Sequence, residues 1–88
     1  MTTPTVAEML RDPSTAEQVA YFAKCEAQFA VATAKPTYNI QIAHTVSAEL
    51  YWLASDLRYS DDNSRDWKAE RTKWNDLNLW ADRVICRY

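Results

Sequence analysis

The chain of 88 residues contains no glycine, and this absence limits the folds that it can adopt. Average usage of about 7% would place roughly six glycines in a chain of this length. Tight hairpin turns need residues at positive φ, which glycine adopts at the lowest cost. Glycine-dependent phosphate-binding loops are excluded as well. The sequence therefore disfavours a hairpin-rich β fold.

The composition indicates one compact domain. Apolar residues make up 48% of the sequence, which is too large a share for a chain that stays disordered in water. The length is close to the lower limit at which a single hydrophobic core is sufficient. No repeat, linker or low-complexity tract divides the chain, so we expect residues 1–88 to form a single helical domain.

Capping and turn residues mark the helix boundaries. Thr5 and Ser14 are each followed three residues later by a glutamate, which is the spacing of a capping box. The residue before Pro36 is disfavoured in helical geometry, and residues 60–64 are all typical of caps and turns. The expected breaks lie near residues 12–14, 35–37 and 60–64.

The segments between these breaks repeat apolar residues at alternating spacings of three and four, the period of an amphipathic helix. Six alanines form such a line in the first segment, and we expect another helix to pack closely against them. They are Ala16, Ala20, Ala23, Ala27, Ala30 and Ala34. The residues expected in the core are Phe22, Phe29, Val46, Leu50, Leu53, Trp74 and Leu77.

Short breaks between long helices favour antiparallel neighbours. The predicted fold is all-α, a small antiparallel bundle of three long helices with a short N-terminal helix laid across it. Residues 38–42 alternate apolar and polar side chains and offer a short strand as the alternative, which is less favoured because no partner strand is evident.

Residues that support catalysis or metal binding are sparse. His44 is the only histidine and lies off the apolar line of its segment, so we expect it to be exposed and without a catalytic role. A calcium loop beginning at Asp61 would have Asp66 where glycine is required and Thr72 where glutamate is required. We therefore expect no enzyme activity, no cofactor and no metal site, and we interpret the acidic cluster as the start of the last helix.

Cysteines, charge and the first residues give the expected environment. Cys25 and Cys86 lack metal-type spacing and are expected to be reduced, with a disulfide as the less favoured alternative. The first residues resemble no signal peptide and no apolar run is long enough for a membrane, so a cytoplasmic protein is expected. A net charge of −2 does not favour binding to nucleic acid.

Two of the three segments contain large aromatic residues that lie off the core line. Leu50 and Leu57 share one arc of a helix, whereas Trp52 and Tyr59 lie nearly opposite and Tyr51 lies on a third side. Trp, Tyr and Arg dominate binding hot spots, although the N-terminal helix or a terminus covering these rings is the alternative. The residues expected to bind a partner are Tyr51, Trp52, Arg58, Tyr59, Trp80 and Arg87.

These patterns predict a small non-enzymatic protein-binding module. Compact helical proteins of this size include accessory proteins, encoded by phages and other mobile elements, that bind and inhibit a host protein, and this is the function that we expect. The partner is expected to be another protein, and self-association is kept open. The alternatives are a helical oligomer that binds a small ligand and a protein that binds nucleic acid or mimics DNA.

Overall fold

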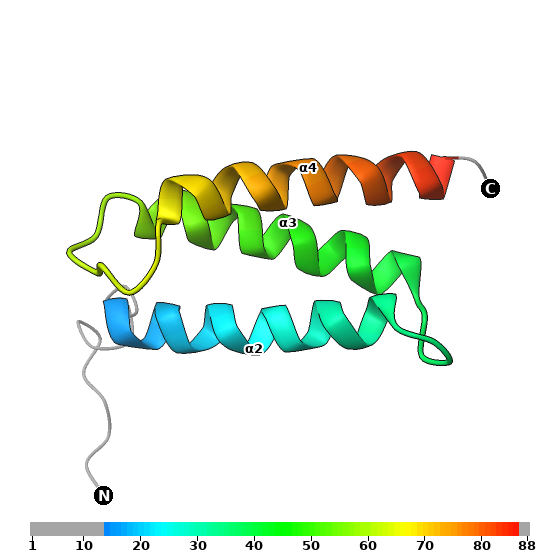
Figure 1. Ribbon diagram of the computed structural model, residues 1–88, viewed down its shortest axis with the longest axis horizontal. Helices are drawn as coiled ribbons and strands as arrows, with labels where there is room; N and C mark the ends of the chain where they lie inside the picture. The colour runs from blue at the N-terminus through cyan, green and yellow to red at the C-terminus, as the bar shows by residue number, and fades with distance from the viewer. Residues whose placement is uncertain (1–13, 87–88) are drawn as a thin grey trace, which may run out of the picture.

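The computed structural model describes residues 14–86, which form three helices. They are α2 (Thr15–Thr33), α3 (Ile40–Leu57) and α4 (Trp67–Cys86). Successive helices run antiparallel, and α3 lies between α2 and α4 (Figure 1). No strand occurs between residues 14 and 86, so the all-α prediction is confirmed and the alternative strand at residues 38–42 is wrong. The predicted short N-terminal helix lies outside the described residues.

Side-chain caps explain why the helices begin where they do. The hydroxyl of Ser14 accepts a hydrogen bond from the backbone N–H of Glu17 at 3.2 Å. The side chain of Asn39 accepts one from the N–H three residues later, also at 3.2 Å, and Asp66 does the same at 3.1 Å. Each cap satisfies an N–H group that has no partner within its own helix. The expected breaks at residues 35–37 and 60–64 both lie in loops.

The core is a cluster of buried side chains from all three helices. Its members are Phe22, Cys25, Leu50, Ala54, Leu57, Trp67 and Trp74. The ring of Phe22 meets Trp67 edge-on with centroids 5.0 Å apart, and Phe29 meets Trp74 at the same separation. These aromatic pairs connect α2 to α4 across the core, in the T-shaped geometry that rings prefer.

The predicted core is correct at its centre and wrong at its edges. Phe22, Leu50 and Trp74 are buried. The other four expected core residues are only half-buried and pack against the cluster from its margins; they are Phe29, Val46, Leu53 and Leu77. The three helices described for residues 14–86 provide no further layer over these flanks, so the four side chains are only half-buried.

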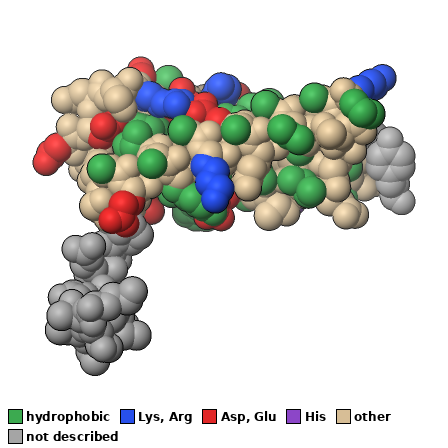
Figure 2. Space-filling view, turned by 90° about the horizontal axis from the view of Figure 1, so that it is seen from below, with side chains coloured by type: hydrophobic (Ala, Val, Ile, Leu, Met, Phe, Trp, Pro, Cys, Tyr) green, Lys and Arg blue, Asp and Glu red, His purple; other side chains and the backbone are tan. Residues whose placement is uncertain are grey.

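The expected packing of a helix against the alanine line of α2 is also wrong for the part of the chain that the structure describes. All six alanines are exposed, and Figure 2, which looks onto the outer face of α2, shows apolar side chains scattered along it. The buried side of α2 contains Phe22, Cys25 and Ala32. A phenylalanine ring gains more from burial than an alanine methyl, so this side faces the core.

A polar contact fixes the packing of α3 on α4. Ser47 is fully buried; its hydroxyl donates to the carbonyl of His44 at 2.8 Å and accepts from the Asn78 side chain at 3.1 Å. Asn78 also donates to the His44 carbonyl at 3.2 Å. His44 itself is half-buried rather than exposed as expected, and its imidazole lies 3.6 Å from the Asp82 carboxylate of α4.

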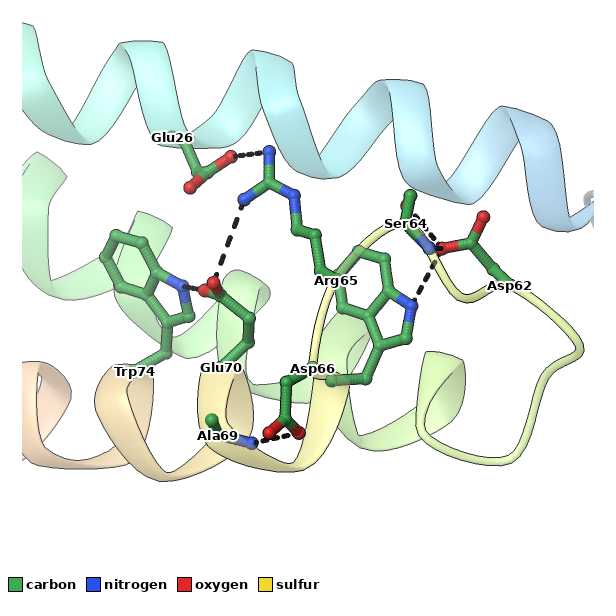
Figure 3. Close-up of polar contacts among 9 residues, drawn as sticks. Glu26, Asp62, Ser64, Arg65, Asp66, Ala69, Glu70 and Trp74 are labelled. Atoms are coloured by element: carbon green, nitrogen blue, oxygen red, sulfur yellow. Dashed lines mark hydrogen bonds and ion pairs between the residues drawn. The ribbon is translucent and has the colours of Figure 1, made fainter.

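The loop between α3 and α4 uses its acidic residues as hydrogen-bond acceptors (Figure 3). Asp62 accepts from the hydroxyl and N–H of Ser64, and from the indole of Trp67 at 2.9 Å. Arg65 forms an ion pair with Glu26 of α2 at 2.6 Å and approaches Glu70 of α4 at 3.9 Å. Residues 14–86 contain no group of three side chains that could hold a metal ion, and none of their helices has the length and apolarity for crossing a bilayer.

Candidate protein-interaction surface

Helix α3 presents two different lines of side chains at the same spacing of seven residues. Leu50 and Leu57 are completely buried, whereas Trp52 is 66% exposed and Tyr59, in the turn just after the helix, is 78% exposed. Seven residues are close to two helical turns, so each line follows one side of the helix. The line of Trp52 and Tyr59 therefore lies on the outer side, away from the core.

Tyr51 belongs to the packing between α3 and α4 rather than to the exposed line. It is half-buried against the core, and its hydroxyl accepts a hydrogen bond from Arg71 of α4 at 3.2 Å. The Arg71 guanidinium also lies 5.4 Å from the centroid of the Tyr51 ring. Tyr51 meets Trp52 edge-on at 5.2 Å, so its contribution to the outer face is to support the Trp52 ring.

Arg58 covers part of the Tyr59 ring. Its guanidinium carbon lies 4.3 Å from the ring centroid, and its Nη2 donates a hydrogen bond to the Tyr59 hydroxyl. The Nε atom of Arg58 is buried and has no partner in the described structure. The stacking and the hydrogen bond together place the exposed Tyr59 ring beside the end of α3.

The two remaining candidate residues lie elsewhere. Trp80 is on α4 and is 40% exposed, and none of the aromatic contacts in residues 14–86 joins it to Trp52 or Tyr59. Arg87 lies outside the described residues. Among residues 14–86, the contacts join Tyr51 to Trp52 and Arg58 to Tyr59 near the end of α3, and none of the aromatic or cation–π contacts joins Trp80 to either pair. The alternative from the sequence was that the N-terminal helix or a chain terminus covers these aromatic rings. Those segments also lie outside the described residues.

Two grooves beside α2 and α3 were missed in the sequence. One, of about 550 Å³, lies near the loop between the two helices and has Val31 and Ile42 on its walls. The other, of about 350 Å³, is lined by Glu17, Gln18, Tyr21, Glu49 and Leu53. A hydrogen bond with Cys25 and the charge of Glu49 raise the pKa of Tyr21 in this groove. Both grooves depend on how α2 packs on α3, which the pattern of a single helix does not specify.

The chain matches no protein-family model, no curated protein and no solved structure. A function can therefore be proposed only from the structure itself.

Proposed function

We propose that the protein is a small protein-binding module and that the outer face of α3 binds its partner. The observation that carries this proposal is the 66% exposure of Trp52 on a helix whose opposite side is fully buried. A tryptophan ring has among the largest apolar surfaces of any side chain, and contiguous exposed apolar surface in a small protein is commonly an interaction site. Tyr59, which is even more exposed, extends the same face.

The arrangement of the arginine supports the same proposal. Arg58 stacks on Tyr59 within the chain, so part of the ordering of this pair precedes binding. Side chains that are already ordered lose less conformational entropy when a partner binds. Trp, Tyr and Arg are also the residue types that are most enriched among binding hot spots.

The experiment is affinity capture from the native host with the full chain, followed by binding measurements with the captured protein. Trp52→Ala and Tyr59→Ala are expected to weaken binding by about 1–4 kcal/mol, the usual range for hot-spot residues. Tyr38→Ala is the matched control, because Tyr38 is 46% exposed but precedes α3 in the opposite loop. Equal binding by the wild type, Trp52→Ala and Tyr59→Ala would rule out this face.

The proposal includes two further predictions: that the chain inhibits the host protein that it binds, or that it associates with another copy of itself. Measuring the activity of the captured partner with and without the chain tests the first. Sedimentation equilibrium of the wild type and Trp52→Ala tests the second, since loss of an oligomer in the variant would identify the partner as another copy.

A small-ligand function is the second candidate, and the groove at Val31 and Ile42 favours it. Its volume of about 550 Å³ falls within the range of ligand-binding pockets. A ligand in this groove would raise the melting temperature of the wild type by mass action. The rise would be smaller in an Ile42→Ser variant.

A further inference from the structure

Among residues 14–86, no lysine or arginine side chain lies over the ring of Trp52, although several other aromatic rings have such a contact. In residues 14–86, arginine or lysine side chains lie over the rings of Phe22, Tyr51, Tyr59, Trp67 and Trp74. Tryptophan binds cations more strongly than the other aromatic residues do. Trp52 is nevertheless the most exposed tryptophan of the described chain and has no such contact.

Two carboxylates flank Trp52 on the same helix. Glu49 precedes it by three residues and Asp56 follows it by four, spacings that make side chains neighbours on a helix surface. Both are exposed, and neither takes part in an ion pair among residues 14–86. Helix α3 contains no lysine or arginine. Arg58, which caps its end, stacks on Tyr59 and forms no ion pair with either acid among residues 14–86.

Glu49 also connects this face to the smaller groove between α2 and α3. Glu17 lies on the α2 side of that groove, and Tyr21 and Leu53 give it apolar surface. No lysine or arginine is among its lining residues; Lys24, further along α2, lines the neighbouring groove instead. The groove and the Trp52 face therefore form one surface that combines apolar side chains with unpaired acids.

We propose that this surface binds a basic amphipathic segment of a protein partner. A lysine or arginine of that segment lies over Trp52 between Glu49 and Asp56, and an apolar side chain enters the groove beside Tyr21 and Leu53. The inference rests on the proposed function and specifies the class of partner. Nucleic acid is disfavoured at this surface because its phosphates would face the same carboxylates.

The test uses the ¹⁵N-labelled full chain and two probe peptides, one of leucine and lysine and one of leucine and glutamate in the same amphipathic pattern. The lysine peptide is expected to shift the Trp52 indole resonance and the amides of Glu49, Leu53 and Asp56. The glutamate peptide is expected to leave them in place. Equal shifts with both peptides, shifts centred on the Val31–Ile42 groove, or no binding of the lysine peptide would overturn the proposal.

Charge-neutral variants separate this inference from the proposed function. Replacing both acids (Glu49→Gln with Asp56→Asn) is expected to lower the affinity for the lysine peptide about fivefold or more. The loss should be smaller at high salt, which screens the charges. Asp76→Asn, an exposed acid on α4, is the matched control and should leave binding unchanged. If binding of the captured native partner depends on Trp52 but not on the two acids, only the inference that the partner segment is basic is overturned. Binding that is independent of Trp52 contradicts the proposed function itself.

Discussion

Leu50 and Trp52 are separated by one residue on α3, yet Leu50 is completely buried while Trp52 is among the most exposed large hydrophobic side chains of residues 14–86. At about 100° per residue, two positions lie roughly 200° apart around a helix. One core cannot take both side chains. The second aromatic line of this helix therefore lies outside the core of the described bundle, and partner binding is the function that we propose for it.

Replacing Leu50 by alanine should lower the free energy of unfolding by about 2–5 kcal/mol, because the lost methyl groups leave a cavity among buried neighbours. The matched variant is Leu79→Ala, whose side chain is 45% exposed on α4 and should cost less than about 1 kcal/mol. Urea denaturation followed by circular dichroism measures both. Similar losses for the two leucines would mean that the core is assigned to the wrong face.

The hydrogen bond between Asn78 and Ser47 should also stabilise the fold. Asn78→Ala removes the hydrogen bonds that Asn78 donates to the Ser47 hydroxyl and to the His44 carbonyl, although Ser47 keeps its own bond to that carbonyl. Each lost bond is expected to cost about 0.5–1.5 kcal/mol. Asn75→Ala, at an exposed position of the same helix, controls for the loss of an amide. A thermal melt that does not distinguish the two variants would contradict this contact.

The two cysteines should differ strongly in reactivity. Both are free, but Cys25 is buried and Cys86 is exposed. Burial raises the pKa of the Cys25 thiol, which further reduces its reactive thiolate form. In the native protein a thiol reagent is expected to modify Cys86 quickly and Cys25 only as fast as the protein opens. In denaturant both should react at once; rapid reaction of both in the native state would contradict the burial.

Asp62 should make stability depend on pH in the acidic range. The hydrogen bond from the Ser64 hydroxyl, with those from Trp67 and the Ser64 N–H, holds the pKa of Asp62 below its ordinary value of 3.8. A carboxyl with a lowered folded pKa contributes stability above its unfolded pKa, and this contribution is lost as the pH falls through the folded value. Asp62→Asn should therefore be less stable than the wild type at neutral pH.

The difference between Asp62→Asn and the wild type should shrink as the pH falls below about 4. Urea midpoints measured across that range provide the test. Asp61→Asn, at an exposed neighbour, should follow the wild-type profile. A constant gap between Asp62→Asn and the wild type at every pH would show that the Asp62 hydrogen bonds do not depend on its charge.

Local signals in the sequence were sufficient for the three described helices and the two breaks between them, whereas the predicted N-terminal helix lies outside the described residues. Ser14 caps α2 as its spacing predicts, and the absence of glycine agrees with a described fold that has no residue at positive φ. Periodicity also identified Phe22, Leu50 and Trp74, because large apolar side chains on one face have no other place to pack. It failed for the alanine line, since small residues fit a close helix contact and an exposed face equally well.

Contacts between distant residues could not be predicted. Arg65 and Glu26 are far apart in the chain, and their ion pair depends on how the loop returns to α2. Tyr51 was grouped with the other candidate residues because a helical wheel does not show that Arg71 of α4 binds its hydroxyl. The pattern did separate Trp52 and Tyr59 from the core, because an angle around one helix is a local property.

The most direct test of the binding face compares folding and binding in one variant, Trp52→Ala. Calorimetric titration of the captured partner into the wild type and the variant gives the change in binding, and thermal unfolding of the same samples gives the change in stability. We predict a loss of about 1–4 kcal/mol in binding with a change in stability below about 0.5 kcal/mol, as expected for an exposed position. A large loss of stability with unchanged binding by the folded protein would show that Trp52 is a packing residue and would contradict the proposed function.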